Sequence, residues 1–198
     1  MINIFDGSDP VLISKRWLSE AEKTELNDAN AMALASVDQA GMPNVRMVLL
    51  KEIDETGFIF YTNYNSVKAT EIFDSGKVAL VMHWKSLRRQ IRVRGEVEKT
   101  SEEQADKYFN TRSLNSRYGA IASEQSKPLS SRDELTKRVS AVMKSTSGNP
   151  ERPKYWGGFK IKPIEIELWA DGEDRLHNRF RYTGGSTNHE WNSQRLFP

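Results

Sequence analysis

The spacing of apolar positions changes along the chain from a helical to a strand-like period. Over residues 9–26 apolar side chains recur at helical spacing, and Asp9 and Pro10 are suited to the N-cap and the first turn. Residues 31–37, 45–51 and 58–62 are then predicted to be short strands joined by polar turns. The pattern therefore predicts an amphipathic helix followed by an antiparallel meander.

Helices and strands alternate in the rest of the chain. Ser66 and Gly76 are suited to the two ends of a short helix over residues 66–73, which a strand over residues 78–84 follows. In residues 89–97 apolar and charged positions alternate, the pattern of a sheet with one buried face. Further helices are expected over residues 101–109 and 130–144, and further strands over residues 158–169, 176–182 and 191–196.

This order of elements predicts an α+β fold, an antiparallel β-barrel with flanking helices, because a doubly wound parallel sheet would alternate single strands with helices. With 198 residues the chain has the size of one domain, so we expect a single domain over residues 1–198. Residues 1–9 are expected to form a flexible N-terminal segment, and residues 145–150, rich in Gly and Pro, a flexible link.

Composition excludes several classes of site. The chain has 29 basic and 27 acidic residues, so net charge indicates neither a nucleic-acid nor a membrane partner. It has no cysteine, which excludes disulfides and thiolate chemistry. His83, His177 and His189 lack the spacing of metal ligands, so we expect no metal, and no Gly-rich phosphate loop is present. The N-terminus lacks the pattern of a signal peptide, and we expect a cytoplasmic location.

Without a phosphate loop, an anion must be bound by side chains, and one strand concentrates cations. If the strand is regular from residue 175 onward, Arg175, His177, Arg179 and Arg181 share one of its faces. A solvated basic surface explains such a row. An anionic ligand lying across it explains the row equally well, because Arg offers fork-shaped donors.

Three further cations lie near predicted element ends. Arg46 and Lys51 are five residues apart in one strand, so they serve one site only if the strand twists, bulges or ends between them. Lys68 lies in the first turn of a helix, where free N–H groups favour a bound anion. Ordinary surface charges explain all three residues as well.

Tyr108, Arg112 and Ser116 recur at a spacing of four. They share one face if the predicted helix continues through Arg112, and their hydroxyl and guanidinium groups suit a phosphate monoester. The alternative is that Tyr108 is an aromatic residue of the core.

Together these residues resemble the pyridoxine/pyridoxamine 5'-phosphate oxidase family over residues 9–198. Several motifs in the same order carry the resemblance, and their combination is more specific than any one motif. They are Asn30-Ala31-Met32, Gly41-x-Pro43, Arg46-Met47-Val48-Leu49-Leu50-Lys51, Phe60-Tyr61-Thr62-Asn63, Arg89-Gln90, Gln125-Ser126, Trp156-Gly157-Gly158-Phe159, Ile166-Glu167-x-Trp169, Arg175-Leu176-His177 and Arg195-Leu196-x-Pro198.

The resemblance implies a split β-barrel that forms a homodimer with FMN between the subunits. By motif position, FMN would be contacted from one subunit by Arg46, Met47, Val48, Leu49, Leu50, Lys51, Tyr61, Thr62, Lys68 and Gln90, and from the other by Gln125, Ser126, Trp169 and Arg179. The substrate phosphate would be held by Lys51, Tyr108, Arg112 and Ser116, with Arg175 and His177 as catalytic residues over the pyridine ring.

The activity implied by the resemblance is the oxidation of pyridoxine or pyridoxamine 5'-phosphate to pyridoxal 5'-phosphate, a step of vitamin B6 biosynthesis and salvage. Hydride would pass from C4' of the substrate to the flavin, and dioxygen would be reduced to hydrogen peroxide. The chain departs from the family pattern at Val67, where a basic residue is common, at Asn178, where Asp is usual, and in a short N-terminal extension.

Three other functions stay open at this point. Another split-barrel flavin or deazaflavin oxidoreductase would keep the strand of Arg46 but need not keep Arg112 or His177. A non-catalytic flavin- or pyridoxal-phosphate-binding protein would keep the phosphate ligands and produce no peroxide. A nucleic-acid-binding barrel would combine basic and aromatic side chains, which the near-neutral charge balance disfavours.

Overall fold

The computed structural model describes residues 3–184 and 190–198 and contains a closed antiparallel barrel. Its strands are β1 (Ala31–Val37), β2 (Pro43–Asp54), β3 (Gly57–Asn63), β4 (Lys77–Trp84), β5 (Arg89–Lys99), β6 (Trp156–Ala170), β7 (Asn178–Gly184) and β8 (Trp191–Leu196). The order β3-β2-β1-β4-β5-β6 closes on itself because β3 also pairs with β6, and β7 and β8 extend the sheet beyond β6. The predicted α+β barrel with flanking helices is confirmed.

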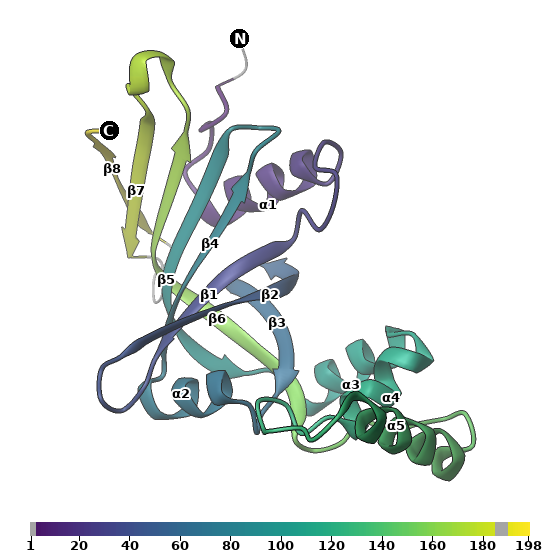
Figure 1. Cartoon of the computed structure of the whole chain (residues 1–198). Coiled ribbons are helices and arrows are strands. Elements are labelled where there is room, and N and C mark those ends of the chain that lie inside the picture. Colours follow the sequence, from purple (N-terminus) through teal and green to yellow (C-terminus); the bar gives the residue numbers. More distant parts are fainter. Residues whose placement is uncertain (1–2, 185–189) are drawn as a thin grey trace.

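The helices lie around this barrel as Figure 1 shows. They are α1 (Pro10–Ala21), α2 (Val67–Ser75), α3 (Glu102–Thr111), α4 (Leu114–Ala122) and α5 (Arg132–Thr146). Helices α3, α4 and α5 form a lobe on the side of the barrel away from β7 and β8 (Figure 1). No helix in the described part of the chain is long and apolar enough to cross a membrane.

Local capping explains where the predicted helices begin and end. The Asp9 side chain accepts a hydrogen bond of 2.8 Å from the Val11 N–H, as expected for the N-cap of α1, although the helix ends earlier than predicted, at Ala21. Gly76 ends α2 in a left-handed conformation (φ 65°), and its N–H donates to the Ile72 carbonyl. These two signals involve only neighbouring residues, which is why they were legible in the sequence.

Helix α4 was not predicted. The predicted helix over residues 101–109 does not continue through Arg112, whose extended backbone (φ −74°, ψ 150°) ends α3. Ser113 then caps a new helix by accepting a hydrogen bond from the Ser116 N–H at 3.3 Å. The break gives two short helices in place of one longer one.

The core fills the barrel and extends under α1. Trp17 of α1 is completely buried with Phe58 and Phe60 of β3, and burial of each such side chain contributes about 1.5–3 kcal/mol. The Trp17 indole N–H donates to the Ile4 carbonyl at 2.9 Å, and Phe5 packs against the Trp17 ring. Flexibility over residues 1–9 stays a prediction, but the side chains of Ile4 and Phe5 pack against the hydrophobic core.

Candidate active site

A cavity of about 640 Å³ lies between the barrel wall and the helical lobe. It is lined by β2, β3, the first turn of α2, the α3–α4 corner and the segment after α4. The sequence-predicted residues that it brings together are Arg46, Met47, Val48, Leu49, Lys51, Tyr61, Thr62, Lys68, Tyr108, Arg112, Ser116 and Gln125. Residues far apart in the sequence thus share one cavity within a single chain.

One end of the cavity is built around Lys68. This lysine is buried in the first turn of α2, and its Nζ donates to Thr62 Oγ1 at 3.3 Å, to Ser66 Oγ at 3.3 Å and to Gln125 Oε1 at 3.4 Å. Burial, together with the positive charge of Arg46, lowers the pKa of Lys68 below its ordinary value. A bound anion would counter both effects, so this end suits a phosphate.

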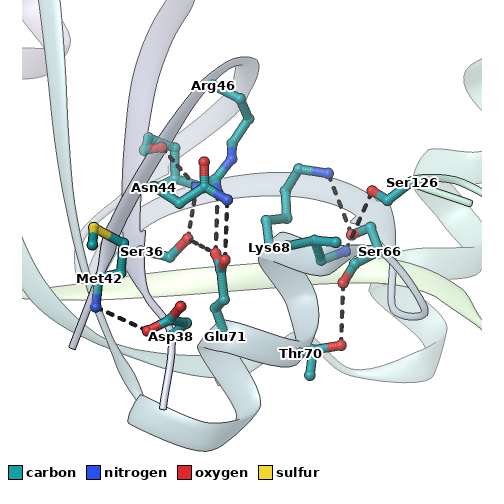
Figure 2. Close-up of polar contacts among 12 residues, drawn as sticks. Ser36, Asp38, Met42, Asn44, Arg46, Ser66, Lys68, Thr70, Glu71 and Ser126 are labelled. Atoms are coloured by element: carbon teal, nitrogen blue, oxygen red, sulfur yellow. Dashed lines mark hydrogen bonds and ion pairs between the residues drawn. The ribbon is translucent and has the colours of Figure 1, made fainter. Parts of the chain in front are cut away.

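Arg46 lies at the same end and is held by three acceptors. Its Nη1 donates to the Leu34 carbonyl at 2.9 Å and to Ser36 Oγ at 2.6 Å, and its Nη2 donates to Glu71 Oε2 at 3.1 Å. Figure 2 shows Glu71 rising from α2 to meet Ser36, Asn44 and Arg46. Burial alone would raise the pKa of Glu71, but hydrogen bonds from Ser36 and Asn44 and the charge of Arg46 outweigh it and lower that pKa.

Lys51 reaches the cavity through a β-bulge. The register between β2 and β3 shifts between Leu50 and Glu52, so Lys51 turns toward the cavity that Arg46 lines. The sequence required a twist, a bulge or a strand end for Arg46 and Lys51 to serve one site, and the bulge at Lys51 meets this requirement. The Leu50 side chain does not line the cavity, because it packs in the barrel core.

The other end of the cavity combines aromatic rings with Arg112. Tyr108 stacks on Tyr61 with ring centroids 3.9 Å apart, and Trp156 lies nearly parallel to Tyr61 at 5.6 Å. The condition for Tyr108, Arg112 and Ser116 to share one helical face is not met, because α3 ends before Arg112. The three residues converge nevertheless, because the α3–α4 corner turns all of them toward the cavity.

Arg112 brings an unsatisfied N–H group to the cavity. Its buried Nη1 has no hydrogen-bond partner among the described residues. Burial lowers the pKa of Arg112, while the neighbouring Tyr108 opposes this effect. A buried guanidinium without an acceptor is costly, so this atom marks the place where an anionic group of a ligand would bind.

Gly158 allows the stacked rings to lie against β6. A Cβ at this position would come within 2.8 Å of Tyr61 Cε1 and 2.6 Å of Thr100 Oγ1. The absence of a side chain therefore lets Tyr61 lie flat beside the strand. Gly158 of the motif Trp156-Gly157-Gly158-Phe159 therefore makes room for a ring that lines the cavity.

Gln125 and Ser126 belong to the same chain as the Lys68 end. Gln125 accepts hydrogen bonds from Thr62 and Lys68, and Ser126 Oγ accepts one from the Val67 N–H at 3.3 Å. The expectation that these two residues approach the cavity of Lys68 from a second subunit is therefore wrong. The loop after α4 folds back over α2 and places them there.

Gln90, Trp169 and Arg179 form a separate row on three neighbouring strands. Trp169 of β6 pairs with Gln90 of β5 on one side and with Arg179 of β7 on the other. None of them lines the cavity of its own chain, so the expected grouping of Gln90 with Arg46 is not found. Arg179 is oriented by the Glu167 carboxylate (2.9 Å) and the Phe197 carbonyl (2.9 Å), independently of Asn178.

Arg175 and His177 precede β7, so the predicted row of four cations on one strand is wrong. Asp174 and Arg175 adopt left-handed conformations (φ 52° and 66°) in the 3₁₀ turn η1 (Glu173–Arg175), which interrupts the alternation of a strand. His177 Nδ1 lies 3.2 Å from Asp171 Oδ1, and its ring centroid lies 4.7 Å from that of Trp169. Figure 1 shows this turn, just before β7, at the far end of the molecule from α3–α5.

Several residues of the cavity were missed by sequence reasoning. They are Asn63, Ser113, Gly119, Ala120, Ser123 and Trp156, together with Glu71 behind Arg46. Trp156 stands in a quoted motif, and Glu71 follows Lys68 by three positions on a predicted helix, so both left a signal. Among the described residues no group of His, Asp and Glu could hold a metal ion, and His189 lies outside them.

Comparison with known families agrees with this geometry. Residues 18–145 match the family Pyridoxamine 5'-phosphate oxidase, and residues 156–198 match the family Pyridoxine 5'-phosphate oxidase C-terminal dimerisation region. A protein of Cereibacter sphaeroides named pyridoxine/pyridoxamine 5'-phosphate oxidase is 60% identical over 98% of each chain. A protein of Allorhizobium ampelinum with the same name is 50% identical over 98% of this chain and 94% of its own.

Solved structures share the fold. The crystal structure of PhzG from Burkholderia lata, in complex with tetrahydrophenazine-1-carboxylic acid, has a TM-score of 0.91 at 29% identity and covers 98% of this chain and 95% of its own. A pyridoxamine 5'-phosphate oxidase-related, FMN binding protein from Nostoc punctiforme has a TM-score of 0.77 at 17% identity and covers 99% of this chain and all of its own. The second likeness concerns the fold alone.

Proposed function

Because this chain belongs to the pyridoxamine 5'-phosphate oxidase family, we propose that it oxidises pyridoxamine or pyridoxine 5'-phosphate to pyridoxal 5'-phosphate with FMN and dioxygen. The observation that carries the proposal is a single cavity lined by two groups of cations, Lys68 beside Arg46 in one and Arg112 beside Tyr108 and Trp156 in the other. Two separate phosphate monoesters, one of the cofactor and one of the substrate, match this arrangement.

The residues present fit FMN. Lys68 and Arg46 offer charged donors for its phosphate, and Thr62 and Gln125 add neutral polar groups beside them. The cavity volume of about 640 Å³ lies in the ordinary range for ligand sites. When bound, FMN supplies the redox chemistry by accepting two electrons from the substrate and passing them to dioxygen.

The chain's own residues bind and orient the substrate. The buried Nη1 of Arg112 lacks a partner, and Lys51, Tyr108 and Ser116 lie around the same cavity. With pyridoxamine 5'-phosphate, dioxygen and water are consumed, and pyridoxal 5'-phosphate, ammonia and hydrogen peroxide are released. With pyridoxine 5'-phosphate, dioxygen is consumed and pyridoxal 5'-phosphate and hydrogen peroxide are released.

We further propose that the site is completed in a homodimer. The turn before β7 that carries Arg175 and His177 lies far from α3 and α4 (Figure 1), whose residues line the cavity, so a second subunit must supply the two side chains if they act on the substrate there. Residues 156–198 match a dimerisation region, which includes both. Exposed apolar side chains of β2, Val45 and Met47 at 64% each, offer a surface for the partner next to the cavity.

Anaerobic spectroscopy tests the proposal. The purified protein should show a flavin spectrum that bleaches on addition of pyridoxamine 5'-phosphate and returns, with peroxide, on admission of air. A flavin spectrum that no pyridoxine or pyridoxamine phosphate bleaches would contradict the oxidase. Tetrahydrophenazine-1-carboxylic acid, the ligand of the PhzG structure, serves as a second reductant, and bleaching by it alone would assign a different substrate.

A further inference from the structure

Glu71 is a buried carboxylate beside cations that suit a phosphate. Its exposed fraction is only 6%, and it lies on α2, one turn after Lys68, on the side that faces β1 and β2. A negative charge so close to an anion site opposes anion binding unless it improves the site in another way. The contacts of Glu71 show what it contributes.

The Glu71 carboxylate is fully engaged by three donors. Ser36 Oγ and Arg46 Nη2 donate to Oε2, and Asn44 Nδ2 donates to Oε1 at 3.0 Å. Ser36 and Asn44 lie on β1 and β2, which pair with each other at these two positions. The carboxylate therefore joins α2 to the two strands that carry the Arg46 end of the cavity.

This network determines which N–H groups of Arg46 remain available. Both N–H groups of Nη1 have acceptors, Leu34 O and Ser36 Oγ, and one N–H of Nη2 is used by Glu71. A guanidinium has five N–H groups in a planar fork. Ser36 Oγ and Glu71 Oε2 are hydrogen-bonded to each other, so they occupy the edge between Nη1 and Nη2. Within the described part of the chain, the Nε–H and the second Nη2–H then have no acceptor, and these two lie on one edge, the geometry that binds two oxygens of a phosphate.

Glu71 also acts on Lys68. Burial and the positive charge of Arg46 both lower the pKa of Lys68, and the negative charge of Glu71 counteracts them. The residue directly before Lys68 is Val67, which offers no charge to an anion. The site therefore depends on Arg46 and Lys68 both being charged and correctly oriented.

We propose that Glu71 is a positioning residue for the FMN phosphate, which fixes the guanidinium of Arg46 with one edge free and balances its charge beside Lys68. This inference rests on the proposed FMN site. It predicts that removal of the carboxylate weakens binding of the phosphate and leaves the binding of the flavin ring almost unchanged.

The test titrates full-length apoprotein with FMN and, separately, with riboflavin, which lacks the phosphate, and follows flavin fluorescence. Glu71→Ala should weaken FMN binding about tenfold or more, since a charge-assisted hydrogen bond is lost, and should change riboflavin binding little. Glu71→Gln keeps an acceptor for Arg46 and should fall between wild type and Glu71→Ala. Asp74→Ala is the matched control, because Asp74 is an exposed acid of the same helix that contacts Gln39, and it should bind FMN as wild type does.

A double-mutant cycle with Arg46→Ala shows whether Glu71 acts through Arg46. In that background Glu71→Ala should cause no further loss of FMN affinity, because the group that it positions is gone. Equal losses for FMN and riboflavin, or the same loss with and without Arg46, would show a merely structural role and overturn the inference. Failure of wild-type protein to bind FMN at all would instead overturn the proposed function.

Discussion

The guanidinium of Arg112 lies over the ring of Trp156, with its Cζ 4.7 Å from the ring centroid. This cation–π contact holds the side chain against the wall of the cavity. Its Nη1 is buried without a hydrogen-bond partner in the described part of the chain. The side chain is therefore fixed by its aromatic face, while its hydrogen-bonding capacity is left for a ligand.

Arg112→Ala is expected to weaken binding of the phosphorylated substrate by about 1.5–3 kcal/mol, the value of a hydrogen bond to a charged group. FMN should remain bound, because the cations proposed for its phosphate, Arg46 and Lys68, lie at the other end of the cavity. Steady-state kinetics and flavin content measure the two effects. Unphosphorylated pyridoxamine is the control, and a wild-type enzyme that binds it as well as pyridoxamine 5'-phosphate would remove the basis of this prediction.

FMN affinity is expected to fall at a lower pH than it would if Lys68 had the pKa of an ordinary lysine. In the proposed site the ammonium form of Lys68 binds the FMN phosphate. Burial and the charge of Arg46 lower the pKa of this lysine below 10.5. As the pH rises through this lowered pKa, the charge is lost in the cofactor-free protein and affinity declines. Lys68→Arg should bind FMN with little dependence on pH in this range, because Arg stays protonated. The same decline in wild type and Lys68→Arg would exclude Lys68 as the titrating group.

Val67→Arg is expected to tighten FMN binding. Val67 is the first residue of α2, directly before Lys68, and 48% of it is exposed. An added guanidinium there can reach a phosphate at the helix N-terminus, although exposure limits the gain to about tenfold, or about 1.4 kcal/mol. Val67→Gln, which is long and polar but uncharged, is the control. A dissociation constant unchanged in Val67→Arg would mean that position 67 points away from the phosphate.

Arg175→Ala and His177→Ala are expected to slow anaerobic flavin reduction at saturating substrate. Both are proposed to orient the pyridine ring, and a misplacement of about 1 Å can cost about a hundredfold in rate. Reoxidation by air should change little, since neither residue is assigned to that step. Stopped-flow absorbance separates the two half-reactions. Wild-type reduction rates in both variants would show that Arg175 and His177 have only a structural role.

Mixing two impaired variants, assayed at a substrate concentration below KM, tests whether one site uses two chains. Arg112→Ala and His177→Ala each remove one contribution to every site of a homodimer. In a mixed dimer one site carries both changes and the other carries neither, so random exchange of subunits should restore about a quarter of wild-type activity. Recovery should be absent if both residues that act at a site come from the same chain, and a mixture of Arg112→Ala with Tyr108→Ala, both from one cavity, is the matched negative control.

The sequence by itself determined most of the elements, although not α4, and indicated the chemical character of the site. Helix starts and ends at Asp9 and Gly76 depend on hydrogen bonds between neighbouring residues, and the alternation in β5 depends on the period of a strand. Cations in family motifs predicted phosphate binding, and the absence of cysteine excluded thiol chemistry. Such signals are local, so one chain without its fold displays them.

Only the tertiary structure decided how these residues meet. The bulge at Lys51 depends on how β2 pairs with β3, and the closure of the barrel depends on β3 pairing with β6. Backbone turns at Arg112 and Arg175 broke the regular periods that would place these residues on shared faces. The first brings Arg112 into the cavity, and the second separates Arg175 from the regular face of β7.

Glu71 shows the physical reason for this division. Its spacing of three from Lys68 puts it near that lysine on a predicted helix, but its neighbours in the sequence do not reveal its partners on β1 and β2. Its role depends on Ser36, Asn44 and Arg46, which β1 and β2 bring to it across the fold. Secondary structure depends on near neighbours, whereas the burial and charge pairing that make a site depend on contacts between distant segments, and only folding forms these contacts.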